Sequence, residues 1–139
     1  MLREDQIAEI RGHLEQAERP VFFFDHDCDG LCSFLLARRF TKKGKGFVVR
    51  GDDREMPASL ARKAEGADVA FVFDVFSLSQ AFVDTLGGMG VKIVWVDHHP
   101  SDFGFSGEPD HVQVYKPDFQ EGVQEPPVSF ELSRIVDVP

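Results

Sequence analysis

Apolar residues follow two kinds of pattern along this chain, and the two kinds alternate. From Ile7 to Ala17 they recur at steps of three and four residues, which predicts an amphipathic helix over about residues 3–18. Three continuous apolar runs come later, at 20–24, 69–73 and 91–96. Runs of this kind, apolar on both faces, are typical of strands in the middle of a parallel sheet.

Further helices and strands are expected between these runs. The patterns predict helices at 31–40, 56–66, 77–88 and 126–136, and shorter strands at 47–50 and 111–115. The apolar density of 31–40 indicates a mostly buried helix. Within 77–88, Ser77 and Gln80 have the spacing of a capping box, in which each side chain accepts a hydrogen bond from the other residue's backbone N–H.

The alternation of helices and strands predicts an α/β fold with three layers, in which helices cover both faces of a parallel sheet. The 139 residues fit one domain and are enough to bury a core. The chain has no apolar run long enough to span a membrane, and its charged start does not resemble a secretory signal. We therefore expect one cytoplasmic domain over 1–139 with no membrane partner.

Acidic and imidazole side chains follow each of the three buried strands. The groups are Asp25, Asp27 and Asp29 after 20–24, Asp74 after 69–73, and Asp97, His98 and His99 after 91–96. The carboxyl ends of parallel strands lie on one edge of a sheet, where ligands bind. We therefore expect these side chains to converge on one site.

Clustered carboxylates repel one another, so such a site must take up protons or hold cations. Oxygen and imidazole ligands without thiolates suit Mn²⁺, Mg²⁺ or a similar ion. Five or more ligands exceed the needs of one ion, and two ions ~3.5–4 Å apart are the arrangement that hydrolyses phosphate esters. The sequence therefore predicts a site for two divalent ions.

Simpler explanations exist for each group alone. A single Asp at a strand end, such as Asp74, is often a turn former or the N-cap of the next helix. A calcium loop that starts at Asp25 would need a Glu at its twelfth position, where Leu36 stands, so an EF-hand is excluded. Three such groups at successive strand ends are hard to explain as turns alone.

The charge balance limits the range of partners. The formal net charge of −9 argues against a protein that coats nucleic acid in general. One segment is nevertheless basic, and its cations are Arg38, Arg39, Lys42, Lys43, Lys45 and Arg50. They fit either the C-terminus of a helix, which favours cations, or a phosphate-binding patch formed mainly by Arg38, Arg39, Lys42 and Lys43. Cys28 and Cys32 are expected to be reduced thiols without a role.

The three motifs resemble those of the DHH phosphoesterase superfamily, and in particular its RecJ-like single-strand exonuclease and oligoribonuclease branch. The stretch DHDCDG at 25–30 is similar to the first motif of that branch, D-x-D-x-D-G. Asp74 matches the second motif, and DHHP at 97–100 matches the third. The resemblance is close over about 18–100 and looser over 126–135, where PPVSFELSRI is similar to the helix that follows the third motif.

The resemblance implies a Rossmann-like domain that hydrolyses phosphodiester or phosphoanhydride bonds with two Mn²⁺ ions. Asp74, His98 and His99 would be the catalytic residues, with Asp74 bridging the ions, His98 binding one, and His99 binding an ion or the phosphate. Asp27 and Asp29 would each hold a different ion, and Asp25 would be a further ligand. Asp97 would orient a histidine by accepting its other N–H.

The chain departs from the family pattern at its C-terminal end. Family members carry a fourth motif with a late Asp, and here Asp137 is the only candidate, too close to the last helix to match well. A C-terminal substrate-binding domain is also missing from the sequence. The chain thus resembles the front two-thirds of a catalytic domain. We expect it to be a piece of a longer protein, a compact variant that acts alone, or a chain whose protein partner supplies the rest.

Three functions remain open on this basis. The first is a nuclease for single-stranded or short nucleic acid, with that nucleic acid or a nucleotide as the substrate. The second is a non-catalytic DHH module that binds metal or a protein partner, as in a replication-helicase component of the superfamily. The third is a small-molecule phosphatase or pyrophosphatase, which suits the negative net charge better.

Overall fold

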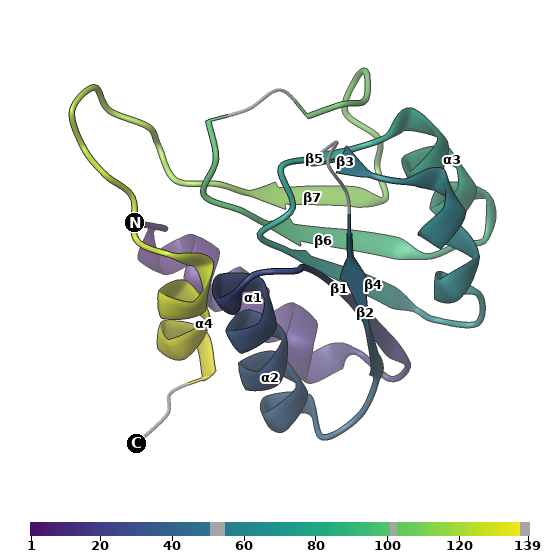
Figure 1. Cartoon of the computed structure of the whole chain (residues 1–139). Coiled ribbons are helices and arrows are strands. Elements are labelled where there is room, and N and C mark those ends of the chain that lie inside the picture. The colour runs from purple at the N-terminus through teal and green to yellow at the C-terminus, as the bar shows by residue number, and fades with distance from the viewer. Residues whose placement is uncertain (51–54, 101–102, 137–139) are drawn as a thin grey trace.

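Five parallel strands form the central sheet of the protein (Figure 1). The structure is a computed structural model, and it describes residues 1–50, 55–100 and 103–136. The strands are β1 (Pro20–Asp25), β2 (Lys45–Val49), β4 (Val69–Phe73), β6 (Lys92–Val96) and β7 (Val112–Tyr115). Their order is β2-β1-β4-β6-β7. The three strands predicted to be buried, β1, β4 and β6, are therefore adjacent, which confirms that prediction.

Helices cover both faces of the sheet, as expected for the three-layer α/β class. The helices α1 (Glu4–Gln16), α2 (Cys28–Thr41) and α4 (Val128–Val136) pack on one face. The 3₁₀ helix η1 (Ala58–Ala64) and α3 (Gln80–Gly88) pack on the other (Figure 1). A separate pair of short parallel strands, β3 (Glu55–Met56) and β5 (Ser77–Leu78), lies beside the main sheet. In the described part of the chain, no helix has the length and apolar character needed to cross a membrane.

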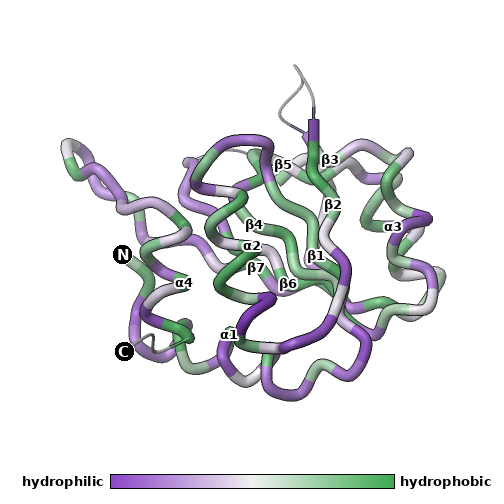
Figure 2. Tube along the Cα trace, turned by 60° about the horizontal axis from the view of Figure 1, so that its bottom comes forward, coloured by the Kyte–Doolittle hydropathy of each residue, from purple (hydrophilic) through white to green (hydrophobic). Residues whose placement is uncertain are grey.

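Alternate residues of each central strand enter two separate hydrophobic cores. Phe22 belongs to the core under α1, α2 and α4, where its ring stacks on Phe71 at 5.4 Å. Phe23 points to the other face and meets the edge of Phe82 at 5.5 Å. Figure 2 shows the hydrophobic colouring along β1, β4 and β6, with hydrophilic segments at the periphery. Burial on both faces explains why these strands read as unbroken apolar runs.

The expectation of a mostly buried helix at 31–40 was wrong. The helix α2 begins earlier, at Cys28, and turns only one side to the sheet and α4. Leu31 and Leu35 are 46% and 47% exposed. Apolar density alone does not show which faces of a helix find a partner, and here one apolar face remains in solvent.

Two other local predictions need correction. The segment predicted as a helix at 56–66 starts with the last residue of β3 and continues as η1. Its helical part is therefore a 3₁₀ helix and not an α-helix. The capping box of Ser77 and Gln80 does not form, because Ser77 pairs in β5. Instead, Ser79 is the N-cap of α3, and its Oγ accepts a hydrogen bond from the Phe82 N–H at 3.2 Å.

Candidate metal centre

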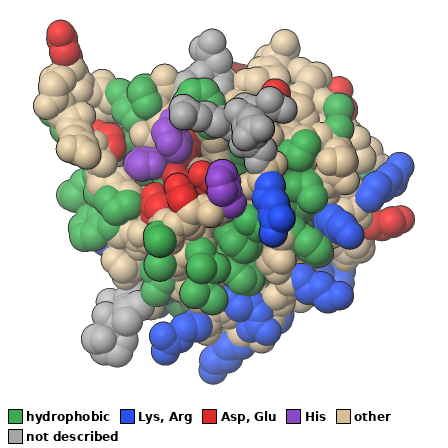
Figure 3. Space-filling model, in the orientation of Figure 1, with side chains coloured by type: hydrophobic (Ala, Val, Ile, Leu, Met, Phe, Trp, Pro, Cys, Tyr) green, Lys and Arg blue, Asp and Glu red, His purple; other side chains and the backbone are tan. Residues whose placement is uncertain are grey.

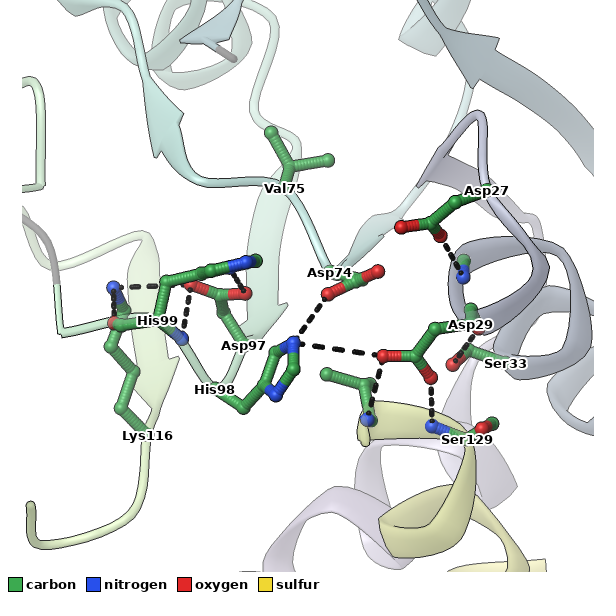
Figure 4. Close-up of polar contacts among 12 residues, drawn as sticks. Asp27, Asp29, Ser33, Asp74, Val75, Asp97, His98, His99, Lys116 and Ser129 are labelled. Atoms are coloured by element: carbon green, nitrogen blue, oxygen red, sulfur yellow. Dashed lines mark hydrogen bonds and ion pairs between the residues drawn. The ribbon is translucent and has the colours of Figure 1, made fainter. Parts of the chain in front are cut away.

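The adjacent strands β1, β4 and β6 bring the acidic motifs together at their carboxyl ends. Asp25 ends β1, Asp74 follows β4 directly, and Asp97 and His98 follow β6. In Figure 3 the red carboxylates and purple histidines gather at one place on the surface, and the close-up shows their side chains pointing toward one another (Figure 4). The predicted convergence of the three motifs is therefore present in the structure.

Asp74 lies at the centre of this arrangement. Its backbone is in the left-handed region, with φ at 62°, and its N–H donates to the Val96 carbonyl at 3.0 Å. Asp is one of the few residues besides Gly that adopts this conformation readily. The turn directs a carboxylate that is only 2% exposed into the space between the strand ends.

The carboxylate of Asp74 is incompletely satisfied. Its Oδ1 is 3.0 Å from His98 Nε2, an ion-pair contact, and has no hydrogen-bond partner among the described residues. Burial is the main cause that raises the pKa of Asp74 to about 7, and Asp29 and Asp27 add repulsion. The contact with Asp74 raises the pKa of His98. A buried oxygen of this kind fits a cation better than it fits solvent.

Two groups of potential metal ligands share Asp74. The first comprises Asp74, Asp97, His98 and His99, and the second Asp25, Asp27 and Asp74. Within each group, the ligand atoms lie within 4.8 Å of one another. All of these donors are carboxylate oxygens or imidazole nitrogens, a set that suits hard or borderline divalent ions. The residues present therefore fit two ions with a common carboxylate.

Both carboxylate oxygens of Asp97 contact polar groups of the protein. Asp97 is 2% exposed, and its Oδ1 lies 2.7 Å from His99 Nδ1 while its Oδ2 accepts from the His99 N–H at 3.2 Å. This contact with Asp97 is the main cause that raises the pKa of His99. Because Nδ1 is held in this way, Nε2 is the ring nitrogen of His99 that remains for a ligand, an arrangement that is typical of carboxylates that orient histidines.

Lys116 belongs to the same network, although no sequence motif pointed to it. It follows β7, which also ends at this edge, and its side chain is 9% exposed. Its Nζ lies 3.2 Å from Asp97 Oδ2, donates to the His99 carbonyl at 2.9 Å, and sits 4.6 Å from the centre of the Trp95 ring. Burial lowers the pKa of Lys116, and Asp97 opposes that effect. No signal in the sequence could have located it, because its place in the site depends on the pairing of β7 with β6.

Asp27 and Asp29 have structural roles that the sequence did not show. Asp27 is the N-cap of α2, and its Oδ1 accepts from the Gly30 N–H at 2.8 Å. Asp29 accepts from the first N–H groups of α4, with Oδ2 at 3.0 Å from Val128 N and Oδ1 at 2.7 Å from Ser129 N. Asp29 Oδ2 is also 3.7 Å from His98 Nε2, so its carboxylate lies between the site and α4 (Figure 4).

The contacts of Asp29 predict a loss of stability on truncation that needs no metal. Asp29→Ala should lower the free energy of unfolding by about 2 kcal/mol in the presence of EDTA, because both N–H groups at the start of α4 lose a charged acceptor. Asp29→Asn should cost less, since the amide oxygen can still accept. Urea unfolding measures both values, and an unchanged stability of Asp29→Ala would show that α4 does not depend on this cap.

Gly30 lets α2 start close to β1. A Cβ at this position would lie 2.2 Å from the Asp25 carbonyl oxygen, closer than any real contact between such atoms. A shift of the backbone away from Asp25 would weaken the hydrogen bond that the Gly30 N–H donates to Asp27 Oδ1. The glycine of the first motif thus sets the spacing between the end of β1 and the first turn of α2.

The basic segment lies away from this site. Arg38, Arg39 and Lys42 are at the C-terminal end of α2, whereas Asp27 caps its N-terminus, so about 15 residues of helix, or ~20 Å, separate them. Arg38 Nε donates to the Gly44 carbonyl at 2.9 Å. Figure 3 shows most of the blue side chains of this face apart from the red and purple group. Of the segment, only Arg50 follows a strand, β2, at the edge that carries the carboxylates.

The other candidate residues lie in or near the first motif or at the C-terminal end. Asp137, the only late aspartate, lies outside the described residues. Cys28 and Cys32 are free and exposed on α2. His26, which the motif also contains, contacts Asp25, with Nδ1 at 3.1 Å from Oδ1.

Comparisons with known proteins identify the fold. No protein-family model matches the chain, and no curated protein matches its sequence. Among solved structures, the chain is similar to RecJ from Thermus thermophilus in complex with Mn²⁺, with a TM-score of 0.66 and 20% identity over 95% of this chain and 19% of that one. It is also similar to an exonuclease RecJ bound to manganese, with a TM-score of 0.61 and 20% identity over 100% of this chain and 40% of that one.

A third similarity shows how widely this architecture is used. The sugar isomerase domain of an RpiR transcription factor from Sphaerobacter thermophilus has a TM-score of 0.57 and 9% identity, over 98% of this chain and 77% of that one. That domain is described as a sugar isomerase domain, a function different from that of an exonuclease, so the fold alone does not determine the chemistry. The chain spans well under half the length of the two RecJ chains. Over the part that they share, its fold is similar to that of the two RecJ structures.

Proposed function

We propose that this chain is a metal-dependent phosphoesterase that hydrolyses phosphodiester bonds, with single-stranded or short nucleic acid as its substrate. The observation that carries the proposal is Asp74, a buried carboxylate shared by two groups of potential ligands at the ends of adjacent strands. The similar RecJ structures are described as bound to manganese, so Mn²⁺ is proposed as the cofactor, with Mg²⁺ as the alternative.

The proposed metal ligands come from all three motifs. Asp25 and Asp27 would hold one ion, His98 and His99 the other, and Asp74 both. When bound, two divalent ions would supply an activated water and stabilise negative charge on the phosphoryl oxygens. Asp97 holds His99 through Nδ1 and its backbone N–H, and Lys116 holds Asp97. The ligand role of Asp29 is retained as a proposal, and it would require the carboxylate to serve an ion as well as α4.

Asp29 also supports a second candidate, a non-catalytic module. In the structure, both oxygens of Asp29 accept hydrogen bonds from α4, so one predicted ligand is engaged in the fold. A further domain or a protein partner that completes the site is compatible with either function, since the RecJ chains are much longer than this one. A phosphatase or pyrophosphatase for small molecules is a further alternative.

Assays on three substrates separate these functions. The purified chain is incubated with Mn²⁺ and a labelled single strand, a dinucleotide or pyrophosphate, side by side. Release of nucleotides from the strand supports the proposed nuclease, whereas turnover of pyrophosphate alone supports the small-molecule alternative. No turnover of any substrate, together with normal Mn²⁺ binding, supports the non-catalytic module.

Binding of the ions should be visible without any substrate. Millimolar Mn²⁺ should raise the melting temperature of the chain by several degrees, because ligands that bind only the folded state stabilise it and because Mn²⁺ relieves the repulsion among the carboxylates. The measurement is a thermal melt in EDTA and in Mn²⁺, with Na⁺ at equal ionic strength as the control. A melting temperature that does not respond to Mn²⁺ would argue against a preformed site.

A further inference from the structure

A groove lies at the opposite edge of the sheet from the candidate metal centre. It has a volume of about 700 Å³ and is lined by the segments that precede β1, β2 and β4, together with the end of η1. That volume is within the range of roughly 300–1,000 Å³ that is usual for small-molecule sites. Because β1 has 6 residues, the groove lies about 20 Å from the carboxylates.

The groove is cationic although the chain has a formal net charge of −9. Its lining has two carboxylates, Glu18 and Glu65, and five cations, Arg19, Lys43, Lys45, Arg62 and Lys63. Among these, Arg19 is paired with Glu18 at 3.8 Å. The exposed side chains of Lys43, Lys45 and Lys63 form no ion pair with the residues that the structure describes. Three lysines without counter-charges around one groove favour an anionic ligand.

The charges are unevenly distributed across the groove. Lys43 and Lys45 flank the start of β2, and Lys63 Nζ lies 5.7 Å from the centre of the ring of Phe47 in the same strand. Glu18 and Glu65, in contrast, precede β1 and β4, which lie further into the sheet. The three lysines thus gather at the β2 side, and the two carboxylates lie at the other side, where Arg19 is also present and pairs with Glu18 at 3.8 Å.

This distribution favours a compact ligand over a polymer. A phosphate chain at the lysines would meet Glu18 and Glu65 if it continued across the groove, and like charges repel. A ligand with phosphates at one end and hydroxyl or amino groups at the other would satisfy both sides. Phe47 and Ala67 add apolar surface to the lining, which suits an organic group.

We propose that this groove binds an organic polyphosphate of the size of a nucleoside triphosphate, with the phosphates at Lys43, Lys45 and Lys63 and the hydroxyl or amino groups at Glu18 and Glu65. This site is separate from the candidate metal centre and does not depend on the proposed phosphoesterase function. It also differs from the predicted patch at Arg38, Arg39, Lys42 and Lys43, with which it shares only Lys43.

Calorimetric titration of the whole chain in EDTA tests the proposal, with ATP, tripolyphosphate and a short oligothymidylate as probes. ATP should bind, and more tightly than tripolyphosphate, because only ATP reaches the apolar and acidic end. Lys45→Glu and Lys63→Glu should each weaken ATP binding by about tenfold or more, since each loses a charge-assisted contact and gains repulsion. Lys45→Gln serves as a milder variant if a reversal impairs folding, which thermal melts check.

Two control variants locate the binding. Arg39→Glu changes the net charge equally but lies outside the lining, so it should leave ATP affinity nearly unchanged. Asp74→Asn should also leave it unchanged, because the metal centre is at the other edge. The proposal is overturned if ATP does not bind at millimolar concentration, if Arg39→Glu weakens it as much as Lys45→Glu, or if only the oligothymidylate binds. Loss of ATP binding in Asp74→Asn would place the ligand at the metal centre and overturn it as well.

Discussion

Asp74→Asn should abolish metal-dependent turnover of phosphodiesters by this chain, or by its complex with whatever completes it. The loss should reach several orders of magnitude, because one carboxylate is shared by both groups of ligands and its removal affects both ions. Asn also tolerates the left-handed backbone at φ 62°, so the strand end should keep its shape. The measurement is turnover of a labelled single strand in Mn²⁺.

The same variant should be at least as stable as the natural chain when metal is absent. Burial raises the pKa of Asp74 to about 7, so the folded chain binds a proton that the unfolded chain has released above about pH 4. With respect to this group, stability is therefore highest in acid and falls as the pH rises toward 7. The raised pKa of His98 acts in the same direction, since its contribution is lost as the pH rises.

The advantage of Asp74→Asn in EDTA should accordingly grow between about pH 5 and pH 8, and its stabilisation by Mn²⁺ should shrink. Asp84→Asn, which changes a carboxylate on the exposed side of α3, is the control and should alter neither. If Asp74 were only a turn former, the variant would instead be less stable in EDTA and would respond to Mn²⁺ like the natural chain. Melts at both pH values distinguish the two cases.

Lys116→Met should destabilise the fold by about 3 kcal/mol or more, even though methionine preserves much of the packing on Trp95. The side chains of Lys116 and Asp97 are 9% and 0% exposed, and removing one partner leaves the other charge buried without compensation. The His99 carbonyl would lose a donor at the same time. Unfolding in urea measures the change.

The double variant Asp97→Asn/Lys116→Met shows whether the charge pair is the cause. It removes both charges while an amide oxygen remains to accept from His99, so it should recover a substantial part of the stability lost in Lys116→Met. Lys45→Met, at an exposed lysine without an acidic partner in the described residues, is the matched control and should change stability little. If the double variant were as unstable as the sum of the single changes, Lys116 would act mainly through packing.

The predictable part of this structure is the part in which local pattern and tertiary burial agree. The runs that became β1, β4 and β6 are buried on both faces, so their composition alone identifies them. Once they are parallel neighbours, Asp25, Asp74 and His98 must lie at one edge. The convergence of the motifs therefore followed from the sequence without knowledge of any contact.

The parts that escaped prediction depend on contacts between distant segments. Asp29 caps α4 across 99 and 100 positions of the sequence, and no local spacing indicates such a pair. Lys116 enters the site only because β7 pairs with β6, and a lone lysine after a short strand carries no signal. The N-cap of α3 moved from Ser77 to Ser79 because β3 pairs with β5, which outweighed the local pattern.

The tight approach at Gly30 affects how tolerance to mutation should be interpreted in this protein. A position without a side chain contributes no ligand and no proton, yet any replacement would force a carbon into the Asp25 carbonyl oxygen. Substitutions there would separate the end of β1 from the start of α2 and so misplace Asp25 and Asp27 without altering either. In a survey of variants, position 30 would therefore be as intolerant as position 74, for a reason that is purely spatial.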